Sequence, residues 1–131
     1  MPLTRRSLFA SAAVAAAAAP RARAVAPSSR VRIGLIGCGG ISVADSNAFL
    51  AHPECEIAVV CDVDDARIKT TLERLEKLGR KRPEAVKDFR RVVDRADVDV
   101  CLVCTPDHWH ALPTIAACRA GKDVYCEKPL A

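Results

Sequence analysis

The sequence has almost no charge imbalance outside its beginning. Residues 1–30 hold five of the 20 basic residues and none of the 16 acidic ones, so the rest of the chain carries a net charge of −1. A near-neutral body lacks the basic patch that binds nucleic acid, and we expect no nucleic-acid partner. Aromatic residues are also few, at 4%, yet half of the residues are apolar. This composition is typical of a globular protein and not of a disordered one.

The chain also lacks an apolar run long enough for a comfortable membrane span. The Ala-rich, uncharged run from Ser7 to Ala19 follows Arg5-Arg6 and precedes the small-x-small sequence Ala22-Arg23-Ala24. This order is typical of an export signal, and the twin arginine resembles a Tat signal. We therefore predict a Tat-like signal over residues 1–26, a periplasmic location and no stable membrane span. The alternatives are a Sec signal, an uncleaved signal that tethers the protein to the membrane, or a chance helical tail.

The seven cysteines lack the spacing of a metal or redox pair. Cys101 and Cys104 form the sole C-x-x-C, inside the apolar run VDVCLVC. A strand would point these two side chains to opposite faces. We therefore interpret the cysteines as small buried hydrophobic residues. They are Cys38, Cys55, Cys61, Cys101, Cys104, Cys118 and Cys126.

The body of the chain alternates short apolar runs with helical patterns and has no internal repeat. These patterns predict strands over residues 31–37, 56–62, 98–104 and 123–127, a stub of strand over 87–89, and helices over 42–51, 64–79, 90–96 and 110–121. Continuous apolar strands between helices indicate a parallel sheet that is covered on both faces. The predicted fold is therefore α/β, a doubly wound parallel sheet of the Rossmann dinucleotide-binding type, over residues 31–131.

A glycine turn follows the first predicted strand. It reads Gly37-x-Gly39-x-x-Ser42, and Ser42 replaces the small Gly or Ala of the phosphate-binding fingerprint. In that fingerprint the first glycine permits a tight turn, and the second lets the backbone approach a pyrophosphate. The free N–H groups of the following helix then hold the phosphates. The turn lies between a predicted strand and a predicted helix, as this interpretation requires.

Asp62 ends the second predicted strand, 25 residues after Gly37. An acid at this position accepts hydrogen bonds from ribose hydroxyls and repels a 2′-phosphate, so NAD is favoured over NADP. A helix N-cap or a loop acid is the alternative role of Asp62. Another nucleotide at the same place, such as S-adenosylmethionine, is the alternative ligand.

The segment CTPDHWH, residues 104–110, follows the third long strand and contains two of the three histidines and the single tryptophan. Ligands bind beyond the carboxyl ends of strands in an open parallel sheet. We therefore interpret this segment as the rim of a crevice. Alternatives are a metal site of His108, His110 and Asp107, plain packing of Trp109, and histidines that cap a helix or fill a loop. The residues that should share the crevice are Gly37–Ser42, Asp62, Thr105–His110 and Glu127–Lys128.

Three stretches, RIGLIGCGGIS, AVVCDVD and DVDVCLVCTPDHWHALPTIAACRAGKDVYCEKPLA, resemble the Gfo/Idh/MocA family of oxidoreductases. The resemblance covers about residues 31–131. It implies that the pyrophosphate would be held by Gly37, Gly39, Gly40, Ile41 and Ser42, and the adenosine ribose by Asp62. The nicotinamide end of the cofactor would be contacted by Thr105, Pro106, His108 and His110. The nicotinamide side would be closed by Glu127 and Lys128 of an E-K-P motif, and Lys128 would reach the substrate.

The resemblance also implies an activity and a missing part. Family members carry a second, C-terminal substrate domain that this chain does not contain, and we expect the chain to be the nucleotide-binding part of a longer enzyme. That enzyme would transfer hydride between NAD and a sugar, cyclitol or related polyol, with Lys128 polarising the reacting C–OH. A surface loop lysine is the alternative for Lys128, and a homo-oligomer is possible. An NAD-dependent glycosidase, and a non-catalytic nucleotide-binding module or inactive fragment, are the alternative functions.

Overall fold

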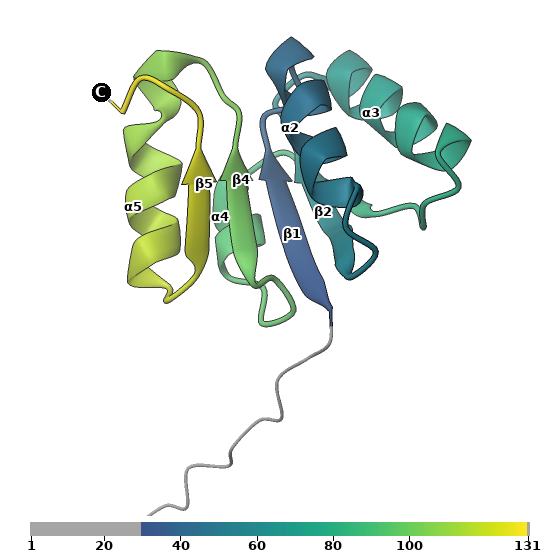
Figure 1. Cartoon of the computed structure of the whole chain (residues 1–131). Helices are drawn as coiled ribbons and strands as arrows, with labels where there is room; N and C mark the ends of the chain where they lie inside the picture. Colours follow the sequence, from purple (N-terminus) through teal and green to yellow (C-terminus); the bar gives the residue numbers. More distant parts are fainter. Residues whose placement is uncertain (1–29, 131) are drawn as a thin grey trace, which may run out of the picture.

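A five-stranded parallel sheet forms the centre of the described part of the chain, residues 30–130, of this computed structural model (Figure 1). The strands lie in the order β3-β2-β1-β4-β5. All pairs are parallel, and the order changes direction at β1, which lies between β2 and β4. The strands are β1 (Val31–Ile36), β2 (Cys55–Cys61), β3 (Glu84–Val86), β4 (Val100–Val103) and β5 (Asp123–Cys126).

Helices cover both faces of this sheet. Helices α2 (Gly40–Leu50) and α3 (Asp65–Lys77) pack on one face, where Leu35, Leu72 and Leu102 share one buried cluster. Helices α4 (Phe89–Val93) and α5 (Ala111–Arg119) cover the other, where Val59, Val92 and Ala117 share a second cluster. The predicted doubly wound α/β fold is therefore confirmed. In Figure 1 the carboxyl ends of the labelled strands β1, β2, β4 and β5 point to the same edge of the sheet.

The stub of strand that was predicted over residues 87–89 was placed three residues too late in the chain. The strand occupies Glu84–Val86, where it pairs with Val59–Cys61, and not residues 87–89. Asp88 ends the extended segment, because its carboxylate accepts the Arg90 amide at 2.9 Å and caps α4, which begins at Phe89. Helix α2 also begins at Gly40 and not at Ser42, since extended Gly39 is its N-cap.

All seven cysteines are free thiols, and five of them are buried. Burial raises the pKa of the Cys38 thiol to about 11, that of Cys61 to about 12 and that of Cys101 to about 11. The interpretation of the cysteines as buried hydrophobic residues is confirmed for these five. It was wrong for Cys118, which lies exposed on α5, and Cys126 is half-buried.

The predicted signal, residues 1–26, lies outside the described residues. Within residues 30–130, none of the helices has the length and apolar character that crossing a membrane would require.

Candidate functional site

The predicted site residues gather at the edge where the strands end, in two groups. The first rim, as we call it, consists of the loop Gly37–Ser42 after β1 and of Asp62 after β2. The second rim consists of Thr105–His110 after β4 and of Glu127–Pro129 after β5. Because β1 pairs with both β2 and β4, the two rims meet beyond the end of β1.

Gly37 is the point at which the rims touch. Its φ of +93° lies in the left-handed region, and its amide donates to the Cys61 carbonyl at 2.8 Å. A Cβ atom at this position would lie 2.6 Å from the carbonyl carbon of Cys104 and 2.7 Å from the Thr105 nitrogen. Only glycine lets the first rim pass this close to the β4 backbone.

Gly39 provides the second close approach in the turn. A Cβ atom built on it would lie 2.8 Å from Nη1 of Arg67, whose guanidinium covers the turn from α3. Gly39 and Gly40 line a cavity of about 410 Å³ with Arg67 and Arg74. Ile41 is exposed at the first turn of α2, and Ser42 is buried, with its hydroxyl donating to the Gly39 carbonyl at 2.6 Å. A small residue is therefore needed at position 42, as the fingerprint requires.

Asp62 holds the glycine turn as well as facing the crevice. Its Oδ2 accepts the Cys38 amide at 2.8 Å, and its Oδ1 accepts the Asp64 amide at 2.9 Å. A carboxylate has about four acceptor positions, so both oxygens keep a lone pair for ribose hydroxyls. Asp62 therefore has a structural role, because it ties the end of β2 to the turn after β1, and the predicted ribose contact would be added to that role.

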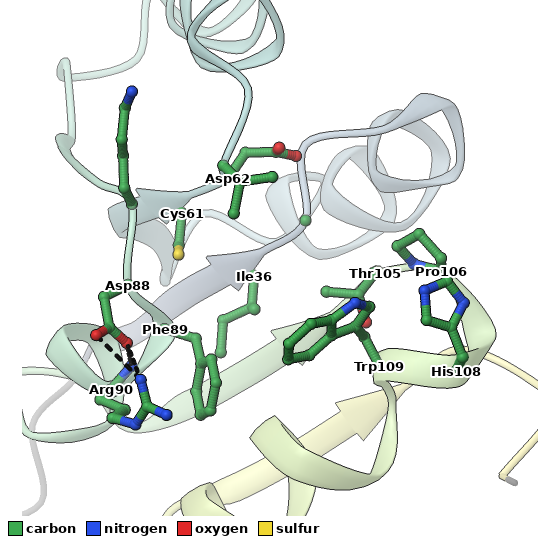
Figure 2. A pocket seen from close by; sticks show the side chains of 13 residues that line it. Ile36, Cys61, Asp62, Asp88, Phe89, Arg90, Thr105, Pro106, His108 and Trp109 are labelled. Carbon is green, nitrogen blue, oxygen red and sulfur yellow. Dashed lines mark hydrogen bonds and ion pairs between the residues drawn. The ribbon is translucent and has the colours of Figure 1, made fainter.

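A cavity of about 430 Å³ lies between the two rims (Figure 2). Gly37 and Asp62 line it from the first rim, and Thr105, Pro106 and His108 line it from the second. The predicted crevice thus unites these five residues. Its apolar walls include Val63, which follows β2. Phe89 and Trp109, from two further segments, also belong to these walls (Figure 2). Trp109 is 46% exposed and lines the cavity, so plain packing does not describe it.

The segment from the end of β3 into the first turn of α4 forms a wall of this cavity that the sequence interpretation missed. It contributes Lys87, Asp88, Phe89 and Arg90. The misplaced third strand hid them, because residues 87–89 were expected inside the sheet and not beyond its end. The sequence did contain a signal for the position of this strand. Pro83 precedes the short strand Glu84–Val86, and the Asx cap at Asp88 follows it.

Thr105 provides a direct test of whether a cofactor fits. Its hydroxyl oxygen is buried and has no hydrogen-bond partner among residues 30–130, although the residue lines the cavity. A buried polar group without a partner costs about 1–3 kcal/mol. A bound ligand with a hydroxyl, phosphate or amide group would supply the missing partner. The Thr105 hydroxyl, the glycine turn and the Asp62 carboxylate together fit a bound dinucleotide.

The two histidines of the second rim have opposite environments. His108 is exposed and lines the cavity, and its backbone amide lowers the pKa of Asp107 by donating to that carboxylate at 2.8 Å. His110 is 3% exposed, and its two ring nitrogens lie 2.8 Å from the carbonyl oxygens of Thr105 and Pro129. No group of three His, Cys, Asp or Glu side chains in residues 30–130 has the arrangement of a metal site.

Glu127 and Lys128 are not among the residues that line this cavity. The Glu127 amide donates to the Val103 carbonyl at 3.0 Å and continues the pairing of β5 with β4. Lys128 is exposed immediately beyond that point, and the Lys128–Pro129 peptide bond is cis.

Residues 31–131 match the family model of the Gfo/Idh/MocA oxidoreductases, described as an oxidoreductase family with an NAD-binding Rossmann fold. The chain is 34% identical over 106 residues to levoglucosan dehydrogenase from Pseudarthrobacter phenanthrenivorans, covering 77% of this chain and 27% of that protein. It is 30% identical to an alpha-N-acetylgalactosaminidase from Shewanella oneidensis, covering 77% of this chain and 23% of that protein. The chain therefore spans about a quarter of the length of these curated relatives.

The fold resembles that of the WlbA dehydrogenase from Chromobacterium violaceum, a crystal structure in complex with NADH and UDP-GlcNAcA. The TM-score is 0.70 at 28% identity, and the match covers 81% of this chain and 29% of that one. Similar structures hold either NADH or NADP.

Proposed function

The chain belongs to the Gfo/Idh/MocA oxidoreductase family as its NAD-binding Rossmann domain, and from this premise we propose that the whole protein transfers hydride between NAD and a sugar-like substrate. The observation that carries the proposal is the cavity lined by Asp62 of the first rim and by Thr105 of the second rim, whose buried hydroxyl has no partner among residues 30–130. A sugar, cyclitol or related polyol is the proposed substrate class. The kinship with levoglucosan dehydrogenase supports it.

The proposed cofactor preference is NAD over NADP. The Asp62 carboxylate is fixed by two backbone amides at the end of β2, so it cannot easily swing away from an adenosine ribose. A 2′-phosphate on that ribose would meet a like charge. Calorimetric titration of this chain with NAD and with NADP tests the proposal, and we expect at least about tenfold tighter binding of NAD, or about 1.4 kcal/mol. Equal affinities would contradict it.

Lys128 is the proposed catalytic residue, and Glu127 would close the same side of the site. The cofactor supplies the hydride acceptor at its nicotinamide ring when it is bound. A cation beside the substrate hydroxyl stabilises the negative charge that builds on the oxygen as the C–H bond breaks. Within residues 30–130 the Lys128 ammonium has no hydrogen bond or ion pair that would occupy it, which supports this role.

An NAD-dependent glycosidase is the second candidate, because the chain is also 30% identical to an alpha-N-acetylgalactosaminidase. The two activities differ in their net products. The protein that contains this chain should be incubated with NAD and a panel of free sugars and aryl glycosides. Release of NADH in step with sugar oxidation would support the oxidoreductase. Hydrolysis without net NADH would support the glycosidase.

Export by the Tat pathway is also proposed, because Tat carries folded proteins and a folded NAD-binding domain can load its cofactor before export. Residues 1–30 fused to a folded fluorescent protein should direct it to the periplasm, and Arg5→Lys with Arg6→Lys should keep it in the cytoplasm. Periplasmic fluorescence that survives both changes would contradict the Tat route. Retention in the membrane fraction would favour the uncleaved tether.

A further inference from the structure

The ring of His110 bridges the two loops of the second rim. Its Nε2 lies 2.8 Å from the Thr105 carbonyl oxygen, in the loop after β4 that lines the cavity. Its Nδ1 lies 2.8 Å from the Pro129 carbonyl oxygen, in the loop after β5. The residue is 3% exposed, so protein atoms and not water surround the ring.

The Pro129 contact matters because little else holds that loop. The pairing of β5 with β4 ends with the Glu127 amide on the Val103 carbonyl at 3.0 Å. In the part of the chain that the structure describes, the contact from His110 is the one hydrogen bond that involves residues 128–130. The side chains of Lys128 and Leu130 are exposed, and Pro129 has no amide proton to donate.

The chemistry of the ring suits this bridging role. A carbonyl oxygen accepts and cannot donate, so each contact requires a proton on the nitrogen that faces it. A ring with one proton holds one carbonyl, and a ring with two protons holds both. The doubly protonated ring donates to both carbonyls, which then occupy the nitrogens that a cofactor would otherwise contact. His108, which is exposed and lines the cavity, has no such carbonyl partners among the described residues.

We propose that His110 is a positioning residue that ties the loop bearing Lys128 to the cofactor-binding loop at Thr105. This inference rests on the proposed function for the roles of Lys128 and of the cavity, and it assigns His110 a different role from the cofactor contact that the sequence implies. Its consequence is that the Lys128 segment has a fixed path in the free chain, before any NAD binds.

Two near-isosteric variants separate the two contacts. In His110→Asn the amide lies near the position of Nδ1 and can still reach Pro129, whereas in His110→Gln it lies near the position of Nε2 and can still reach Thr105. Backbone relaxation by NMR without NAD reads the order of the Lys128 and Leu130 amides. We expect wild type and His110→Asn to keep order parameters near about 0.85, and His110→Gln and His110→Ala to fall below about 0.6.

The exposed His52 provides a matched control, and His52→Ala should leave the Lys128 and Leu130 amides unchanged. Wild-type order at both amides in His110→Ala, or equal order in the Asn and Gln variants, would overturn the proposal. A His110 that contacted the cofactor instead would weaken NAD binding in every variant while leaving the order of the free loop as it is.

A wild-type measurement keeps the test valid if the variants fail to fold. Ring-selective nitrogen NMR should show a His110 ring proton that exchanges with water at least about tenfold more slowly than those of His52 and His108. Equal exchange at all three rings would overturn the proposal. Failure of the chain to bind NAD would contradict the proposed function, yet it would leave both the relaxation data and the ring exchange to decide the role of His110.

Discussion

The two rims of the cleft are built in different ways, although both lie beyond parallel strands. The first rim uses backbone and one carboxylate, since Gly37 and Gly39 supply space and Asp62 fixes the Cys38 amide. The second rim uses side chains, since Thr105 lines the cavity with a buried hydroxyl that has no hydrogen-bond partner among residues 30–130, and the buried His110 ring bridges two loops. Substitutions that add volume should therefore disrupt the first rim. The second rim depends instead on the hydrogen-bond partners of Thr105 and His110.

Replacement of Gly37 should have the largest effect, because the first rim depends on shape there. Gly37→Ala places a Cβ atom 2.6 Å from the Cys104 carbonyl carbon at a φ of +93°. We expect a loss of roughly 1–3 kcal/mol in the free energy of unfolding from the backbone strain alone, and more from the clash. NAD affinity should fall more than about tenfold, a change of about 1.4 kcal/mol. Urea unfolding and calorimetry measure both quantities.

Gly40→Ala is the matched control for Gly37→Ala. A Cβ atom at Gly40 meets nothing within 4 Å, and its φ lies outside the left-handed region. Its free energy of unfolding should change by less than about 1 kcal/mol. Equal destabilisation by the two alanines would show that the close approach of the rims at Gly37 is unimportant.

Changes at Asp62 should come next, because this residue joins the two parts of the first rim. We expect Asp62→Ala to weaken NAD binding by about tenfold or more, since a hydrogen bond to a charged group contributes about 1.5–3 kcal/mol. Asp62→Asn keeps the shape and removes the charge, so it should lose less NAD affinity and narrow the difference between NAD and NADP. Asp123→Ala removes an exposed carboxylate at the start of β5 that does not line the cavity, and it should leave NAD affinity unaltered. An unchanged Asp62→Ala affinity would remove the ribose assignment.

The second rim is tested by removing the Thr105 hydroxyl, which has no hydrogen-bond partner among residues 30–130. We expect Thr105→Val to weaken NAD binding by a factor of about 3–10, because a neutral hydrogen bond contributes about 0.5–1.5 kcal/mol. The free chain should be as stable as wild type or more stable, because the buried hydroxyl has no partner to lose. Thr114→Val removes a similar buried hydroxyl on α5, which has no partner within the described part of the chain and does not line the cavity. It should leave NAD affinity unchanged, and a matching loss in both variants would deny Thr105 a role in binding.

The smallest effect at neutral pH comes from the buried thiols of Cys38, in the first rim, and Cys61, at the end of β2. Burial raises the pKa of Cys38 from 9.0 to about 11 and that of Cys61 to about 12. The folded state therefore binds protons more tightly than the unfolded state. Its stability is undiminished below about pH 9 and falls as the pH rises through about 11 and 12. Urea unfolding under reducing conditions between pH 7 and pH 10.5 should show this decline, and a flat profile would contradict the burial of these thiols.

The first rim and the sheet could be predicted from the sequence because both depend on local patterns. Apolar runs next to helical periodicity identify the parallel strands, and the spacing from Gly37 to Asp62 identifies the turn and the acid. The third strand was misplaced because three residues carry little periodicity, and the cavity wall at Phe89 was missed with it. The separate environments of His108 and His110 could not be predicted, since the partner of His110 at Pro129 lies 19 residues away in the sequence.

The measurement that most directly tests the central claim is a titration of the isotopically labelled chain with NAD, followed by backbone NMR. The account predicts saturable binding, with the largest amide shifts at Gly37–Ile41, Asp62 and Thr105, where the two rims meet. No saturable change at millimolar NAD would contradict it. So would shifts confined to residues outside the two rims, because the cleft between them would then not be the cofactor site.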